Sequence, residues 1–109
     1  MATALKVLGQ SAPSAASLTT LYTVPGATTT AVSSIVVCNQ SATPTSFRIA
    51  VRPAGAGIDT QMYLYYDVTI QGNNTFVATI GMSLATTDVI SVYATLATLS
   101  FSLFGQENS

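Results

Sequence analysis

The sequence predicts an all-β protein: a single small β-sandwich or jelly-roll-like barrel of about seven to eight antiparallel strands, with an N-terminal arm. Three observations support this prediction. Apolar and polar residues alternate with period 2 along much of the chain, no window carries the i, i+3, i+4 spacing of an amphipathic helix, and turn residues recur at short intervals. The 109 residues amount to one domain, which is large enough to bury a core.

Eight segments combine β-branched residues with alternation, and we expect each to form a strand. In chain order they are Leu5 to Gly9, Leu18 to Val24, Val32 to Asn39, Ser46 to Pro53, Gln61 to Ile70, Thr75 to Gly81, Asp88 to Ala94 and Leu99 to Gly105. Residues with turn chemistry separate them, at Pro25-Gly26, at 39–44, at 53–59, at 72–74 and at 85–88.

The first segment is set apart from the others by a stretch rich in Ala, Ser and Pro. Residues 10–17 are typical of a linker, so we divide the chain into an N-terminal strand and arm at 1–17 and a sandwich body at 18–109. A strand on such an arm can add itself to the open sheet edge of a neighbouring subunit. The first strand could therefore pair away from its own domain.

Segments 46–53 and 61–70 predict a hairpin in which paired residue numbers sum to 115. This register puts apolar residues on one face and charged residues on the other, and a slip by one residue would mix them. On the buried face it pairs Phe47 with Val68, Ile49 with Tyr66, and Val51 with Leu64. On the outer face it pairs Arg48 with Asp67 and places Arg52 opposite Tyr63, with Tyr65 also pointing outward.

The charge composition excludes several functions. Only 6% of residues are charged, with three Lys and Arg, four Asp and Glu, and no His. Nucleic acids and anionic membranes are bound by clustered basic residues, so neither is an expected partner. Without His the chain lacks the usual general base and the commonest metal ligand. The single cysteine, Cys38, lies in an apolar strand and is interpreted as a small core residue.

No motif in the chain predicts catalysis. The four acids are Asp59, Asp67, Asp88 and Glu107, and none lies in a calcium-binding loop. Asp88 precedes a strand, where its carboxylate is expected to bond loop backbone. We expect no enzymatic activity, no cofactor and no metal. The first 20 residues lack the pattern of a secretory signal, and no apolar run is long enough to span a bilayer, so we expect synthesis in a cytoplasm.

The scarcity of charge suggests that other subunits cover much of the surface. Strands 32–39 and 99–105 are apolar on both faces, which is typical of a buried layer or a subunit contact. Tyr beside Arg is a pairing enriched at interfaces, although an exposed cation–π contact within one hairpin explains it equally well. The candidate interface residues are Leu5, Val7, Arg48, Arg52, Tyr63, Tyr65, Asp67 and Phe104.

Several segments resemble small β-rich virion proteins of tailed bacteriophages. They are LYTVPGATTTAVSSIVVCN (21–39), FRIAVRPAGA (47–56), YLYYD (63–67), TIGMSLATTDVISVYAT (79–95) and SFSLFG (100–105). The resemblance covers nearly the whole chain, and its motifs are structural. It implies a capsid decoration, or cement, protein that is often trimeric and that binds the major capsid protein at the particle surface. The alternative it leaves open is a component of the tail, baseplate or fibre that contacts other tail proteins or binds a receptor or glycan.

Overall fold

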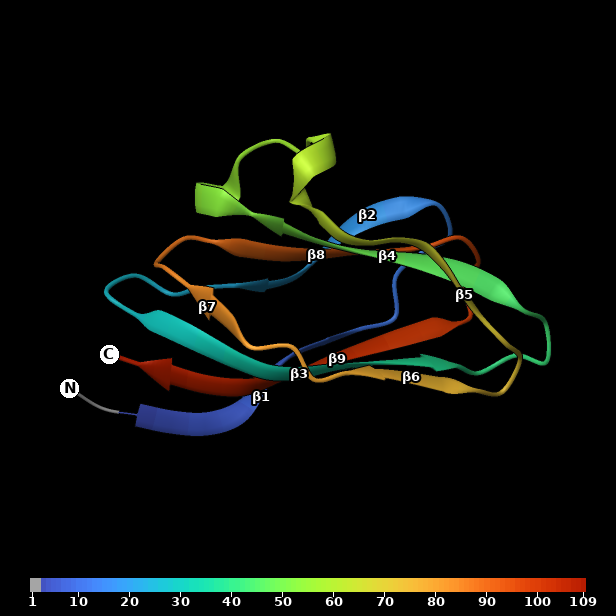
Figure 1. Ribbon diagram of the computed structural model, residues 1–109, viewed down its shortest axis with the longest axis horizontal. Helices are drawn as coiled ribbons and strands as arrows, with labels where there is room; N and C mark the ends of the chain where they lie inside the picture. Colours follow the sequence, from blue (N-terminus) through green and yellow to red (C-terminus); the bar gives the residue numbers. More distant parts are fainter. Residues whose placement is uncertain (1–2) are drawn as a thin grey trace.

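Two antiparallel sheets pack face to face in the computed structural model, which describes residues 3–109 (Figure 1). The first sheet has the order β1 (Thr3–Ser11), β9 (Leu99–Asn108), β3 (Thr29–Asn39) and β6 (Thr75–Ala78), with β7 (Met82–Leu84) also paired to β3. The second has the order β2 (Ser17–Thr23), β8 (Val89–Ala94), β4 (Thr45–Arg52) and β5 (Tyr63–Ile70). The predicted all-β sandwich is confirmed for these residues.

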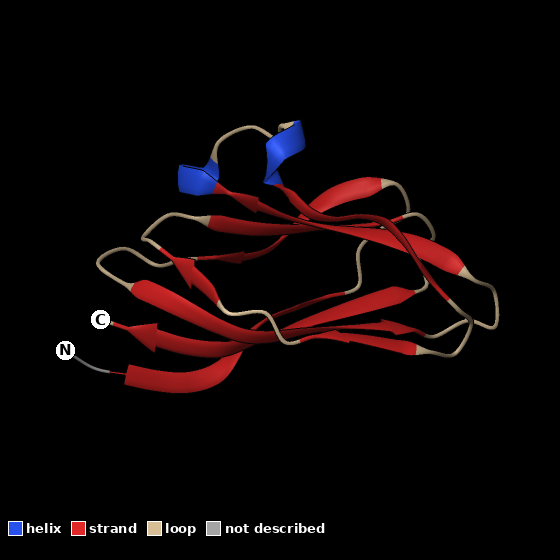
Figure 2. Ribbon diagram, in the orientation of Figure 1, coloured by secondary structure: helices blue, strands red, loops and turns tan. Residues whose placement is uncertain are grey.

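The segment between β4 and β5 contains two short 3-10 turns, η1 (Pro53–Gly55) and η2 (Thr60–Met62), which lie above the second sheet (Figure 2). The expected strand at 61–70 therefore begins two residues later, at Tyr63. The expected strand at 75–81 divides into β6 and β7, because residues 79–81 leave the ladder on β3. The strands thus differ from those expected at their ends and at the interruption between β6 and β7.

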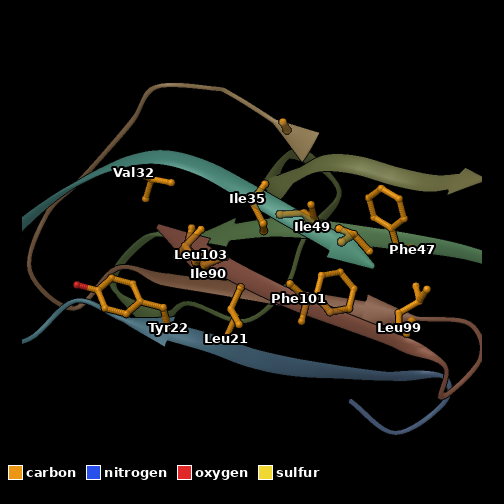
Figure 3. Packing of buried hydrophobic residues seen from close by; sticks show 14 of the residues in the cluster. Leu21, Tyr22, Val32, Ile35, Phe47, Ile49, Ile90, Leu99, Phe101 and Leu103 are labelled. Carbon is orange, nitrogen blue, oxygen red and sulfur yellow. The ribbon is translucent and has the colours of Figure 1, made fainter. Parts of the chain in front are cut away.

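The core lies between the sheets and is apolar (Figure 3). Phe47 of β4 and Phe101 of β9 are fully buried, and their ring centroids lie 6.3 Å apart across the two sheets. Phe76 of β6 packs on Phe47 at 5.1 Å, and Tyr65 of β5 packs on Phe76 at 5.4 Å. Burial of each large apolar side chain contributes about 1.5–3 kcal/mol, so this layer supplies most of the stabilisation.

The register of β4 with β5 follows the prediction at one end and departs from it at the other. Phe47 pairs with Val68 as expected, but Ile49 pairs with Tyr65 instead of Tyr66. The cause is a β-bulge in which Tyr66 and Asp67 both lie across from Arg48, and Asp67 has a positive φ of 52°. Beyond this bulge the faces of Tyr65 and Tyr66 are exchanged. A second irregularity at Leu64, between the pairs Ile49–Tyr65 and Ala50–Tyr63, returns Tyr63 to the outer face.

The exchange corrects several sequence-based assignments. Tyr66 and Leu64, expected in the core, are 58% and 45% exposed. Tyr65, expected outside, packs against the core. The expected pairs of Val51 with Leu64 and of Arg52 with Tyr63 do not form, because Ala50 pairs with Tyr63.

The first strand is not a separate arm. β1 pairs with β9 of its own sheet from Thr3 to Ser11, and Leu8 packs against the core. Residues 12–16 then lead into β2 of the second sheet. The expectation of an arm whose strand pairs away from its own domain is therefore corrected: β9 offers a matching edge, and the short connection lets β1 reach it.

Gly9 marks the point where β1 passes closest to β2. A Cβ atom built on Gly9 would overlap the backbone carbonyl oxygen of Leu21. The position of a Cβ is fixed by the backbone that carries it, and the carbonyl oxygen is itself backbone. A rotamer change therefore gives no relief, and the two strands would have to separate.

We expect Gly9→Ala to lower the free energy of unfolding by about 1–3 kcal/mol, measured by chemical denaturation. Gly26→Ala is the matched control, because a Cβ there has no neighbour within 4 Å. Equal effects of the two substitutions would contradict a close backbone approach at Gly9.

Candidate functional site

The outer face of the second sheet carries a cluster of aromatic side chains around one arginine. We call Arg48, Tyr63, Tyr66, Asp67 and Tyr93 the Arg48 cluster. The bulge in β5 builds it, because two residues of β5 oppose the single residue Arg48, while Tyr93 of β8 is its partner on the other side. Three neighbouring strands thus converge on one guanidinium group.

The guanidinium group of Arg48 contacts one carboxylate and the faces of two aromatic rings. Its Nε donates a hydrogen bond to Oδ1 of Asp67 at 2.6 Å, and its Nη2 donates to Oδ2 at 3.3 Å. The guanidinium carbon lies 4.2 Å from the ring centroid of Tyr66 and 4.4 Å from that of Tyr93. The hydrogen bond to Asp67 raises the pKa of Arg48, so the group stays charged. The predicted ion pair between Arg48 and Asp67 is confirmed.

Tyr63 completes the cluster at its edge. Its ring packs edge-to-face on Tyr66, with centroids 5.0 Å apart. Together with Thr60, these two tyrosines line an open hollow of about 380 Å³. The arrangement offers aromatic ring surface next to a neutralised charge pair, which suits contact with a flat partner.

Two of the candidate interface residues have other roles. Tyr65 faces the core, as described above. Arg52 holds the connection that follows β4: its Nε donates to the carbonyl oxygen of Ala56 at 2.7 Å, and its Nη2 donates to that of Gly55 at 2.9 Å. Arg52 therefore stabilises the η1 turn of its own chain.

Asp88 secures the same turn from the opposite side. Its carboxylate accepts hydrogen bonds from the backbone N–H groups of Ala54 and Ala85, both at 2.9 Å. The predicted role of Asp88 as an acceptor for loop backbone is confirmed.

Sequence reasoning missed two members of the Arg48 cluster. Tyr66 was assigned to the core because the alternation along 61–70 gives no sign of a bulge. Tyr93 was not a candidate, although alternation along β8 points it away from the buried Val92 and Ala94. Pairing of β8 with β4 puts Tyr93 opposite Arg48, and this pairing is the signal that predicts its place in the cluster.

A second surface lies on the outer face of the first sheet. We call Leu5 and Val7 of β1 together with Phe104 of β9 the β1 patch. Val7 and Phe104 are paired across the ladder, and Leu5 and Val7 are 81% and 49% exposed. The open hollow of about 520 Å³ that they line also includes Lys6, Ala31, Ser33, Gly105 and Gln106. These three candidate residues are therefore brought together by the fold.

The outer face of the first sheet continues beyond the β1 patch without charge. Val36 of β3 pairs with Val77 of β6, which is 58% exposed, and Cys38 pairs with Thr75. Cys38 is half-buried on this outer face, since its neighbour Val37 occupies the core side. The interpretation of Cys38 as a core residue is corrected by the alternation of β3.

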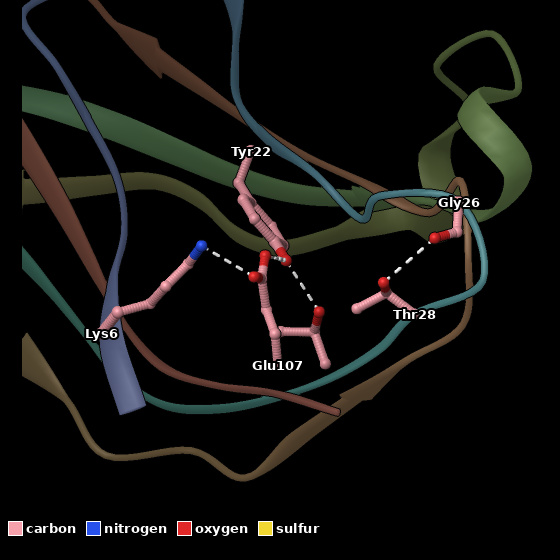
Figure 4. A network of polar contacts seen from close by, with 6 residues as sticks. Lys6, Tyr22, Gly26, Thr28 and Glu107 are labelled. Atoms are coloured by element: carbon pink, nitrogen blue, oxygen red, sulfur yellow. Dashed lines mark hydrogen bonds and ion pairs between the residues drawn. The ribbon is translucent and has the colours of Figure 1, made fainter. Parts of the chain in front are cut away.

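A polar network joins the two sheets at the end near the chain termini (Figure 4). Glu107 of β9 accepts a hydrogen bond from the hydroxyl of Tyr22 of β2 at 2.5 Å and forms an ion pair with Lys6 of β1 at 2.7 Å. The Tyr22 hydroxyl also lies 2.7 Å from that of Thr30. The bonds from Lys6 and Tyr22 lower the pKa of Glu107. Burial and the bond to Glu107 raise the pKa of Tyr22 to about 12.

Among the described residues, neither surface carries a cluster of metal-ligating side chains. Within residues 3–109, no three Cys, Asp or Glu side chains gather closely enough to hold a metal ion. The described part of the chain also has no helix of the length and apolar character needed to cross a membrane.

The fold is an antiparallel two-sheet β-sandwich, with the Arg48 cluster on the outer face of one sheet and the β1 patch on the outer face of the other. Comparison of the chain with models of protein families, with curated proteins and with solved structures finds no match.

The polar network predicts a dependence of stability on pH. A carboxylate whose pKa is lowered in the folded state stabilises the protein above its unfolded value, near 4.3, and loses this contribution as pH falls through the folded pKa. We therefore expect Glu107→Gln to lower the free energy of unfolding at pH 7, with the difference from wild type shrinking as the solution is acidified below about pH 4.

Denaturation curves at a series of pH values measure this difference. Lys6→Met is the matched background, because it removes the ion pair but keeps an alkyl chain, and Glu107→Gln should have a smaller effect there. A difference between wild type and Glu107→Gln that stays constant down to about pH 2 would show that the Glu107 charge contributes nothing.

Proposed function

We propose that this protein is a non-enzymatic structural subunit of a tailed-phage particle, and in particular a capsid decoration protein that binds the outside of the shell as a homo-oligomer. The observation that carries the proposal is the uncharged outer face of the first sheet. Leu5, Val7 and Val77 are all about half exposed or more there, while the seven charged residues lie on the second sheet, in loops or in the Glu107 network.

Exposed apolar side chains of this size are unfavourable in water unless a partner covers them. The sequence resemblance to small phage virion proteins is our reason for proposing the major capsid protein as that partner. Decoration is a binding task, so it needs no catalytic group. Many copies on a symmetric shell convert a modest affinity per subunit into stable coverage.

The copy number on purified particles tests this proposal. Quantitative mass spectrometry is expected to find this chain in numbers on the order of hundreds per particle, comparable with the shell subunit. A few copies to a few dozen would favour the tail. Absence of the chain from particles would overturn the virion assignment altogether.

A matched pair of variants tests which face binds the shell. Val77→Lys places a charge on the outer face of the first sheet, and we expect it to reduce binding of the purified protein to undecorated shells by about tenfold or more. Thr69→Lys places the same charge on an exposed position of the second sheet. Equal binding by both variants would show that the first sheet is not the contact.

The Arg48 cluster favours a second candidate function, that of a tail-associated module that binds a receptor glycan. Exposed tyrosine rings stack on sugar rings, and Tyr63 and Tyr66 line a hollow at the sheet surface. Against it, the carboxylate of Asp67 is already engaged by Arg48, which leaves few groups to bond sugar hydroxyls.

Binding of the isolated protein to a panel of immobilised bacterial-surface oligosaccharides tests the second candidate. If it is correct, Tyr66→Ala should abolish a measurable signal. Leu64→Ala, on an exposed side chain of the same strand, should leave the signal intact. No binding to any member of the panel would leave decoration as the proposed function.

A further inference from the structure

The free edge of β1 differs from the other edges of the two sheets. In the described residues, β2 carries a bulge at Leu21, and β5 carries the bulge at Asp67 together with its charge. The remaining edge consists of β6 and β7, of four and three residues, interrupted between them. Bulges, charges and short strands are the devices that prevent a sheet edge from pairing with another chain.

Over its first five described residues β1 carries one of these devices, the charge of Lys6, and no bulge. From Thr3 to Val7 its register with β9 is unbroken, and the bulge at Leu8 comes only afterwards. The charge of Lys6 is paired with Glu107 at 2.7 Å, so it is neutralised within the chain although the side chain is half exposed. Leu5 and Val7 lie exposed on the outer face. This edge therefore combines backbone N–H and C=O groups that have no strand partner with exposed apolar side chains.

We infer that β1 pairs antiparallel with β1 of a second copy of this chain, joining the two first sheets into one continuous sheet across a two-fold axis at Leu5. This inference deepens the proposed function by naming the contact between copies, and it rests on that function only for the expectation of a homo-oligomer. The occupant is a second copy because an open strand edge is satisfied by another strand, and this edge is complementary to itself.

The register follows from the pattern of side chains. Thr3, Leu5 and Val7, the odd-numbered residues of the segment, lie on the outer face. They are paired with one another across the two-fold axis only when the numbers of the two paired residues add to an even sum. A sum of 12 would place Lys6 directly opposite Lys6 of the second copy, which is unfavourable. A sum of 10 places Leu5 opposite Leu5, Val7 opposite Thr3, and Lys6 opposite Ala4. The apolar row from Phe104 through Val7 and Leu5 then continues into the second copy.

Edge-to-edge pairing through β1 gives a dimer and does not build a closed ring of three copies, the state that the sequence resemblance implies. A ring needs β1 to meet a different edge of the next subunit. The other edges are bulged, charged or interrupted, as described above. A two-fold dimer uses β1 alone.

Sedimentation velocity on the full chain tests the oligomeric state. A five-residue edge contact buries less than a standard interface, so we expect a monomer–dimer equilibrium with a Kd on the order of 10–100 µM. A monomer at every concentration up to about 1 mM, or a trimer without a dimer, would overturn the inference. Because particles are not involved, this result is independent of where the protein acts.

Two lysine variants separate the β1 edge from the rest of the sheet face. Leu5→Lys sets like charges against each other across the axis, and we expect it to raise the Kd by about tenfold or more. Val77→Lys adds the same charge at the opposite edge of the same sheet and should leave the Kd unchanged. Equal weakening by both would assign the contact to the whole face and overturn pairing at β1.

Disulfide trapping tests the register in a Cys38→Ser background, which removes the native thiol. Leu5→Cys should form a disulfide-linked dimer, since directly opposed Cβ atoms lie about 4.5–5.5 Å apart. Val7→Cys alone should not, because its copies would be separated by about four residues along the strands, roughly 13 Å. A mixture of Thr3→Cys and Val7→Cys proteins should again form a linked dimer.

Equal cross-linking by Leu5→Cys and Val7→Cys would indicate random collision and overturn the register. All these positions are exposed, and unfolding midpoints equal to that of the parent verify that each variant is folded.

Discussion

The packing of apolar side chains between the two sheets is the interaction on which the rest of the molecule depends. Phe47 and Phe101 meet at its centre, and Phe76 and Tyr65 extend the contact at one end. With 6% charged residues the chain has few ion pairs to add, so burial of apolar surface must offset the entropy of ordering the backbone. The positions of both outer surfaces follow, because each outer side chain alternates with a core residue.

The few charges are used locally. Arg52 and Asp88 secure one connection, Lys6 and Glu107 fasten the edge strand to the sheet, and Arg48 with Asp67 neutralise each other on the second sheet. Each of these charged groups has its hydrogen-bond or ion-pair partner within the chain. The outer face of the first sheet is therefore left to hydroxyl and apolar groups, which makes it the face best suited to a neutral partner surface.

The Arg48 cluster and the β1 patch differ in how many contacts their groups already make within the chain. In the Arg48 cluster, ring faces and carboxylate contact the guanidinium, so a ligand would have to displace or extend existing contacts. In the β1 patch, Leu5 has little around it, and the strand edge beside it is unpaired on its outer side. The exposed side chain and the unpaired strand edge are the reasons for which we propose assembly rather than ligand binding.

The sequence alone determined the fold class, most strand positions, the pair of Arg48 with Asp67 and the bonding of Asp88 to loop backbone, because alternation and turn chemistry are local signals. Tertiary structure decided the faces of Tyr65 and Tyr66, since a bulge adds one residue to one strand and leaves no mark in the alternation. It also decided that β1 joins its own sheet, because strand partners are chosen by long-range pairing with β9. Periodicity tells which residues share a face, but only the assembled sheets tell what lies against it.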